Sequence, residues 1–213
     1  MYVLVMFYHT KGEVFLNPQE TRAKLISQTV SVIANFGLDK TTTKAIVADT
    51  GINEAYIYRY FAGKEDLLAK TFDSLDNELV EKALQYLPAM YDTDREYEAR
   101  CRDYFFPIWQ FLLGNREKCL AYVQYFYSPY FPRLSAENHY LRFTPVVEKF
   151  REAFIEEAEV WLILNHILNV ALDFAVKVHN NQMPEDDNYG EHVFRVIYAS
   201  IKQYFKTNRK SEE

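Results

Sequence analysis

The chain is poor in glycine and proline, with six and seven among its 213 residues, and it has two cysteines. Few turn-forming residues argue against an all-β fold, which needs many tight turns. Two cysteines, Cys101 and Cys119, cannot form a disulfide framework. Free thiols are typical of a reducing cytoplasm, where we expect this protein, and we interpret both as ordinary helix residues rather than a redox sensor.

The sequence also lacks the motifs that mark common enzymes. We find no Gly-rich phosphate loop, no Gly-x-Ser-x-Gly, no His-Glu-x-x-His and no Glu-x-x-His pair. We therefore expect no catalytic residues and no cofactor. Four histidines could suggest a metal, but no pair has ligand spacing on a predicted helix and no cysteine lies beside them, so we expect no metal site. These are His139, His166, His179 and His192.

No targeting or membrane segment is expected. The opening MYVLVMFYHTKGE has no basic leader and no small-residue cleavage site, so we predict no signal peptide. We expect no run long and apolar enough to span a bilayer. Residues 1–16 are interpreted as an N-terminal extension, and Met6 is an alternative start.

The net charge of −6 taken alone argues against binding to nucleic acid, whose phosphates attract Lys and Arg. The charge is uneven, because seven basic and six acidic residues lie between Pro18 and Phe72. That segment is therefore +1 and the rest of the chain is −7. Any DNA contact would be local and would depend on geometry.

Helical periodicity dominates the chain and predicts an all-α protein. Residues 128–132 are expected to be an irregular aromatic link, and Pro107 is expected to kink its helix. The predicted helices are 18–36, 42–50, 54–60, 64–87, 97–113, 116–127, 144–157, 158–180 and 188–206. We divide the chain into an extension at 1–16, a three-helix DNA-binding domain at 17–63, and a larger helical ligand-binding and dimerisation domain at 64–213. Residues 64–87 form the connecting helix of that larger domain.

The stretch GINEAYIYRYFAGKEDL, residues 51–67, has the features of a helix-turn-helix. Gly51 provides the tight turn, and Asn53 can cap the next helix. In such a unit the second helix enters the major groove with its N-terminal residues near base edges. The hydroxyls of this helix and Arg59 are suited to phosphate, whereas Phe61 and part of Tyr60 are expected to pack inward. Arg59 could also be a solvated helix residue.

Residues 21–67 resemble the DNA-binding domain of the TetR family of bacterial transcriptional regulators. The pattern is Gly37-Leu38 after the first helix, a Thr-rich cap in TTTKAI from Thr41, GIN from Gly51, and IYRYF from Ile57 before KEDL at Lys64. The sequence departs from the family at Val47, at Asp49-Thr50, at Glu54 and at Tyr56. The first two departures should not break the unit, whereas Glu54 and Tyr56 bear on the operator sequence. Glu54 would be repelled by phosphate unless it accepts a hydrogen bond from a cytosine amino group.

The resemblance implies a homodimer that binds a pseudo-palindromic operator and is released by a small ligand. It also assigns a DNA-facing role by position. The residues concerned are Thr42, Thr43, Lys44, Asn53, Glu54, Ala55, Tyr56, Tyr58, Arg59 and Lys64.

The excess of tyrosine and tryptophan in the remainder favours a ligand pocket, because each carries a polar group that a dry core would have to satisfy. For any single residue, ordinary core packing is the simpler interpretation. An aromatic pocket suits an apolar, flat or cationic compound. The candidate residues are Tyr104, Phe105, Trp109, Tyr122, Tyr125, Phe126, Tyr130, Trp161, Asn165, His166 and Asn169. Asn165, Asn169 and Asp173 share one face and are either polar anchors of this pocket or a polar seam in a subunit interface.

Residues 158–180 are apolar on most sides and need cover on most sides. The segment is therefore either the central helix of the body or part of a subunit interface, and the short loop to the next helix favours the interface. We predict that 158–180 and 188–206 pair with the same helices of a second copy, forming a four-helix bundle. The function predicted is a ligand-responsive DNA-binding regulator, and a repressor, with double-stranded DNA as its partner. The alternative is a helical protein-interaction module that retains a helix-turn-helix without binding an operator.

Overall fold

The computed structural model describes residues 17–206, and helices account for nearly all of its regular structure. The N-terminal extension predicted at 1–16 lies outside the described residues. No β-strand is formed between residues 17 and 206, where one isolated bridge joins Phe154 and Phe205. The prediction of an all-α protein is confirmed.

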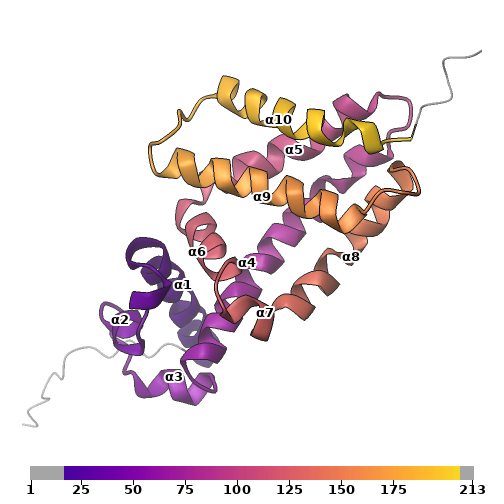
Figure 1. Cartoon of the computed structure of the whole chain (residues 1–213). Coiled ribbons are helices and arrows are strands. Elements are labelled where there is room, and N and C mark those ends of the chain that lie inside the picture. Colours follow the sequence, from indigo (N-terminus) through magenta and orange to yellow (C-terminus); the bar gives the residue numbers. More distant parts are fainter. Residues whose placement is uncertain (1–16, 207–213) are drawn as a thin grey trace, which may run out of the picture.

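Ten α-helices and three short 3₁₀ turns follow one another in residues 17–206 (Figure 1). The first group is α1 (Pro18–Phe36), η1 (Leu38–Lys40), α2 (Thr43–Val47), α3 (Ala55–Tyr60), α4 (Lys64–Tyr86) and η2 (Leu87–Tyr91). The second is α5 (Tyr97–Gly114), α6 (Arg116–Phe126), α7 (Tyr130–Leu134), α8 (Ala136–Ala153), α9 (Val160–His179), α10 (Asp187–Ile201) and η3 (Lys202–Tyr204).

Local sequence explains the bounds of α1. Asn17 caps the helix by accepting from the Glu20 amide at 2.9 Å, while the Glu20 carboxylate accepts from the Asn17 amide at 3.0 Å. This reciprocal pair satisfies amides that the first turn leaves free, and Pro18 fits the first helical position. Gly37 ends the helix with φ of 93°, a conformation that other residues rarely adopt.

Several predicted boundaries were wrong, including the helix ends expected at 157 and 206, which lie at Ala153 and Ile201. The helix expected at 42–50 ends at Val47, because the Thr50 hydroxyl bonds the Val47 carbonyl at 2.9 Å and so competes with the helix. The link expected at 128–132 contains α7, whose prolines lie at its start, where a missing amide costs little. Helix α8 starts at Ala136 instead of 144, so Pro145 lies inside it rather than at its first turn.

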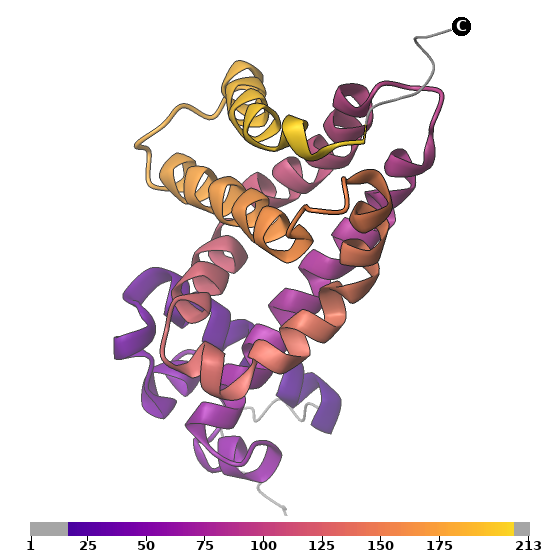
Figure 2. The same ribbon diagram turned by 45° about the vertical axis from the view of Figure 1, so that its right-hand side comes forward.

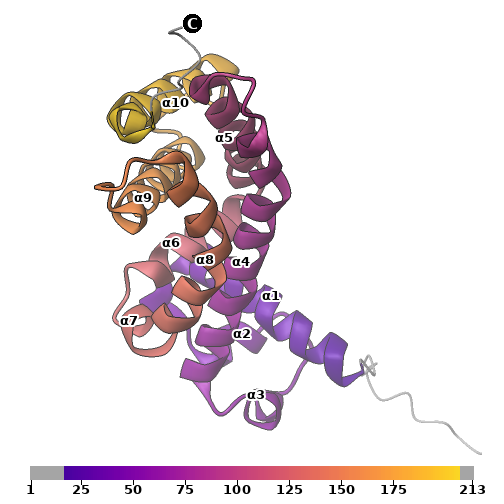
Figure 3. The same ribbon diagram turned by 90° about the vertical axis from the view of Figure 1, so that its right-hand side faces the viewer.

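Two hydrophobic clusters organise the described residues. The small cluster joins α1, α2, α3 and the start of α4 through Leu25, Ile46, Ile57, Phe61 and Leu67. The large cluster contains buried side chains from α4, α5, α6, α8, α9 and α10. Helix α4 contributes to both and runs from the small cluster into the body (Figures 1 and 3).

The N-terminal helices are also held to the body through α6, which packs along α1. The Gln124 side chain spans the turn at Gly37, because its amide donates to the Ile33 carbonyl and its oxygen accepts from the Leu38 amide, both at 3.0 Å. Glu117 of the same helix accepts from Asn35 at 2.7 Å and from Ser31 at 3.1 Å. Figure 2 shows the end of α1 beside α6.

Helix α9 corrects the expectation that no segment could span a bilayer, since it is long and apolar enough by length and composition. Helices in the core of a protein can be equally long and apolar, so one such helix is weak evidence for a membrane. In the structure α9 packs against α5, α6, α8 and α10. Part of its surface stays uncovered, and Leu162 is 69% exposed.

Gly190 of α10 packs closely against Trp109 of α5 in the large cluster. A Cβ at this position would lie 2.8 Å from the Trp109 indole nitrogen, so Gly190→Ala forces the two helices apart. We expect the clash to outweigh the helix propensity gained and to lower the free energy of unfolding by about 1–2 kcal/mol in urea titrations. Gly114→Ala is the control, because nothing lies within 4 Å of its Cβ, and it should be neutral or stabilising. Equal behaviour of the two variants would contradict the packing described.

Candidate DNA-binding and ligand-binding sites

Helices α2 and α3 meet through a turn that the sequence itself specifies. Thr42 caps α2, its hydroxyl accepting from the Ala45 amide at 3.1 Å. Gly51 turns the chain with φ of 70°. Asn53 then accepts from the Ala55 amide at 2.9 Å and starts α3. Buried Ile46 and Ile57 hold the two helices together in the small cluster.

Helix α3 has one buried face and one exposed face. Ile57 is buried, and Phe61 immediately after the helix is buried too. Tyr58 is 62% exposed, and Arg59 is exposed beside it. The Arg59 guanidinium lies 5.8 Å from the ring centres of both Tyr56 and Tyr60, which keeps the cation at this surface.

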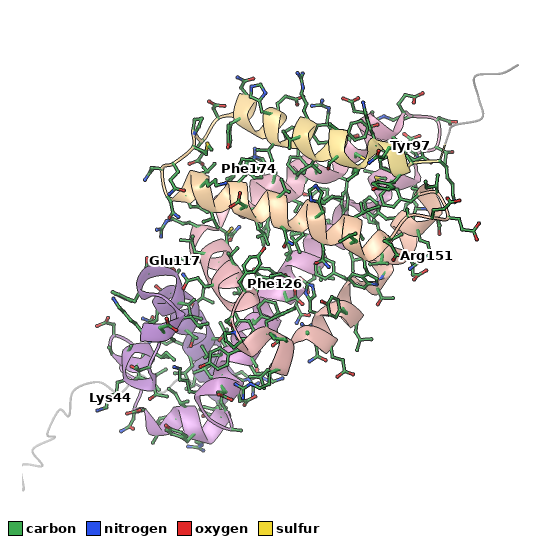
Figure 4. All side chains as sticks on the ribbon, in the orientation of Figure 1. Lys44, Tyr97, Glu117, Phe126, Arg151 and Phe174 are labelled. Atoms are coloured by element: carbon green, nitrogen blue, oxygen red, sulfur yellow. The ribbon has the colours of Figure 1, made fainter. Side chains whose placement is uncertain are left out.

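The ten predicted DNA-facing residues lie together on α2, the turn, α3 and the first residue of α4. Lys44 and Arg59 are exposed, while Lys64 is half-buried. In Figure 4 the label of Lys44 marks this end of the molecule, which lies away from α10. Arg22, an exposed cation of α1 whose guanidinium lies 4.9 Å from the centre of the Phe61 ring, was not among the predicted residues.

Glu54 has a partner that the sequence did not reveal. Its carboxylate accepts a hydrogen bond of 2.5 Å from the Thr43 hydroxyl, joining the start of α3 to the start of α2. In this arrangement the charge faces the amino-terminal end of a helix, where an anion is favourable. Glu54 therefore has a structural contact within the helix-turn-helix in addition to its position near the expected base edges.

An apolar cavity of about 100 Å³ lies inside the body, between α4, α5, α8, α9 and α10. A water molecule needs about 10–15 Å³ by this measure, so the space exceeds that of a single water. Aromatic rings from four helices form much of the wall. They are Tyr104, Phe105, Trp109, Phe143, Phe150, Trp161, Phe194 and Tyr198. None of the lining residues is Asp, Glu, Lys or Arg.

The structure brings five of the predicted ligand-binding residues to this cavity and leaves the others elsewhere. Those lining it are Tyr104, Phe105, Trp109, Trp161 and Asn165. Those outside its wall are Tyr122, Tyr125, Phe126, Tyr130, His166 and Asn169. The Tyr125 hydroxyl is bonded to Ser135 at 2.9 Å, and His166 is exposed and bonded to Ser200 at 3.0 Å.

Polar groups in the cavity wall are few. Burial raises the pKa of Tyr104, so its hydroxyl stays protonated and able to donate. Asn165 adds an amide from α9, and His139 adds an imidazole from α8. Pockets of this kind, apolar with a few polar groups, are typical sites for small organic molecules.

A buried polar cluster, which we call the Asp76 cluster, lies beside the cavity and was not foreseen. Asp76 of α4 is completely buried and accepts from the Tyr122 hydroxyl at 3.0 Å and from His139 Nδ1 at 2.9 Å. Arg142 donates to Asp76 at 2.9 Å and to Asp73 at 2.6 Å. Burial and the Asp76 carboxylate raise the pKa of Tyr122 well above its ordinary value, which keeps this donor protonated.

Only the pairing of these residues across the fold reveals the cluster. Asp76 and its partners come from α4, α6 and α8, which are separated by up to 66 residues in the chain. In the sequence, Asp76 looks like an ordinary acidic residue of an amphipathic helix. Its one local signal is its place among Leu75, Leu79 and Val80, on the apolar side of α4.

A three-helix unit whose second and third helices form a helix-turn-helix is a DNA-binding architecture. Residues 25–71 match the family model for bacterial regulatory proteins of the tetR family. No curated protein sequence matches the chain.

Solved structures share the fold of nearly the whole chain. A TetR family transcription regulator from Marinobacter aquaeolei VT8 is 18% identical, with a TM-score of 0.66 over 84% of this chain and 94% of that one. The fatty acid degradation regulator FadR from Bacillus halodurans is 17% identical, with a TM-score of 0.66 over 85% and 96%. A TetR-like regulator from Rhodococcus sp. RHA1 is 14% identical, with a TM-score of 0.58 over 88% and 98%.

The resemblance to the TetR family is thereby confirmed, and this chain has the fold of TetR family transcription regulators. At these identities the solved structures establish the fold alone. What each of them binds does not transfer to this chain by similarity.

Burial raises the pKa of the Cys101 and Cys119 thiols to about 12. At pH 8 both therefore stay protonated, and we expect 5,5′-dithiobis(2-nitrobenzoate) to label them on the order of 10³-fold more slowly in the folded protein than in urea. The unfolded chain ionises its thiols near pH 8.5, so their contribution to stability is lost as the pH rises from there through about 12. Fast labelling of the native protein at pH 8 would contradict this burial.

Proposed function

We propose that this protein is a DNA-binding transcriptional repressor that acts as a homodimer in the cytoplasm and is released from its operator by a small, mainly apolar molecule. The observation that carries the proposal is the exposed face of α3, where Tyr56, Tyr58 and Arg59 are exposed to solvent beside a buried Ile57. It is joined by a match to the tetR family model over the same helices.

The charge distribution supports DNA contact by this end of the molecule. Arg59 lies on α3, Lys44 on α2 and Lys64 at the start of α4. Phosphate contacts by such side chains fix the register of a protein on DNA. Base readout is then expected from the start of α3 and the residues just before it, with Asn53, Glu54, Ala55 and Tyr56 nearest the base edges. We assign residues 17–63 to DNA binding and 64–213 to ligand binding and dimerisation.

A second copy is supported by the faces that α9 and α10 leave open. Leu162 of the mostly apolar α9 is 69% exposed, and Val196 of the amphipathic α10 is 57% exposed. Two such helix pairs related by a twofold axis would cover these side chains in a four-helix bundle. The dimer would present its two α3 helices to successive major grooves, about 34–36 Å apart.

The cavity supports a ligand response. Its walls come from five helices, including α4, which leads directly to α3. In one conformation of the dimer the spacing of the two α3 helices matches the major grooves, and in another it does not. A molecule that binds the cavity more tightly in the second conformation would shift the population away from the DNA-bound form. We therefore expect an apolar or aromatic effector, held by rings such as Trp109 and Trp161.

The DNA contact is tested by the double variant Arg59→Ala, Lys64→Ala. Footprinting on the DNA that flanks the protein's own gene should show a protected palindrome for the parent protein. The variant should bind at least roughly tenfold more weakly, with a salt slope smaller by about four, because each of two protomers loses two phosphate contacts.

The matched control for that experiment is Arg151→Ala. Arg151 is exposed on α8 and lies at the far end of the body from Lys44 (Figure 4). This variant also loses a positive charge, but it should bind like the parent. Unchanged binding by the double variant would remove the regulator interpretation and favour the alternative, a helical module that binds another protein.

The dimer is tested by Leu162→Glu. Placing a charge at this exposed apolar site should weaken association by at least about 3 kcal/mol, because two carboxylates would enter the interface of a symmetric dimer. Light scattering after gel filtration should then show a monomer at concentrations where the parent is a dimer. Leu141→Glu, at a comparably exposed leucine of α8, should leave the dimer intact. A dimer of the Leu162 variant would place the interface elsewhere.

A further inference from the structure

His139 takes part in two features at once. Its ring lines the apolar cavity, and its Nδ1 atom lies 2.9 Å from the Asp76 carboxylate of α4. The other two side chains that bond Asp76, those of Tyr122 and Arg142, do not line this cavity. Among the described residues, His139 is therefore the one hydrogen-bonded link between the cavity wall and this carboxylate.

The Asp76 carboxylate cannot be displaced on its own. It is completely buried, and a buried carboxylate that loses its donors is strongly unfavourable. Since Asp76 accepts from His139, a movement of the His139 ring has two outcomes. Either α4 follows the ring, or the cluster loses a bond that solvent cannot replace.

The first turns of α4 carry such a movement to α3. Leu67 of α4 packs in the small cluster with Ile57 of α3. The same stretch is tied to neighbouring helices by Asp73–Arg142 at 2.6 Å and by Glu65–Arg133 at 2.9 Å. A change at Asp76 therefore reaches the helix-turn-helix through packed and bonded residues, without crossing a loop of the body.

The cavity wall also restricts what can enter it. With no Asp, Glu, Lys or Arg among its lining residues, an ionised ligand would be buried without a partner charge. The Tyr104 hydroxyl and the Asn165 amide can each bond a neutral polar group.

We propose that the cavity takes an uncharged, mainly apolar molecule with one neutral polar group, and that His139 transmits its presence to α4 through Asp76. This rests on the ligand response proposed above and adds the class of ligand and the residue that reports it. His139 is a positioning residue here, because it acts on α3 only through Asp76 and α4.

The ligand class is tested with 4-ethylbenzamide and 4-ethylbenzoate, which share a ring and differ in charge near pH 7. Thermal unfolding at about 10 mM of each should show a rise in Tm with the amide and at least tenfold weaker binding of the carboxylate. The rise should vanish in Ala171→Phe or Ala83→Leu, each of which fills the cavity from a different helix. Equal binding of both compounds, or binding of neither, would overturn the proposal.

The transmission is tested by hydrogen exchange at residues 65–75 of α4, with and without the amide. His139→Phe keeps a ring in the wall and removes the bond to Asp76, whereas His139→Asn keeps a donor near the Nδ1 position and removes most of the ring. In the parent, exchange should change on the order of fivefold or more on binding. Both variants should still bind the amide yet show no change in α4.

Tyr122→Phe is the matched control, because it removes another hydrogen bond to Asp76 without altering the cavity wall. It should respond like the parent. Two results would overturn the transmission through His139. One is a normal response in a folded His139 variant, which would leave the direct contacts of Leu79 and Ala83 as the route. The other is amide binding by the parent with no change in α4.

None of these readouts includes DNA. A failure to find an operator would therefore contradict the proposed regulator and leave the ligand test intact. Conversely, a parent protein that protects an operator but binds neither compound would retain its DNA function and lose this inference.

Discussion

Helix α4 places Leu67 in the small hydrophobic cluster and the adjacent Leu68 in the large one. Because consecutive residues of a helix point in different directions, α4 can contribute side chains to both hydrophobic clusters at the same time. The position of α3 against DNA is thus tied to the packing of the body. The hydrogen bonds of Gln124 to the turn after α1 make a second attachment, so the N-terminal helices cannot swing freely about α4.

The parts of the fold that the sequence predicted are those with local causes. Asn17, Gly37 and Gly51 set helix ends through their own backbone and side-chain bonds, and the bounds of α1 were predicted correctly. The error at the end of α2 arose from the Thr50 hydroxyl, which competes with the helix, and two other errors lie at prolines. Pro129 precedes α7, where a missing amide costs little, and Pro145 lies within α8.

Of the two candidate sites, the DNA-binding site also has local causes, whereas the cavity depends on tertiary packing. The residues of α3 could be named from one continuous stretch, because a helix-turn-helix is a local motif. The cavity needed side chains from five helices, and aromatic content alone could not separate its wall from the core. Tyr104 and Trp109 line it, whereas Tyr122 and Tyr125 use their hydroxyls in buried bonds to Asp76 and Ser135. Such hydrogen bonds depend on how segments pack in three dimensions, and the spacing of residues along the sequence does not predict them.

Trp109 and Trp161 are the two tryptophans of the chain, and both line the cavity. Light at wavelengths longer than those that tyrosine absorbs therefore excites only these two side chains, both in the cavity wall. The colour and lifetime of the resulting emission describe the polarity and crowding of that place, with no label attached. The intrinsic tryptophan fluorescence of the protein therefore reports whether the cavity is empty, hydrated or occupied by a ligand.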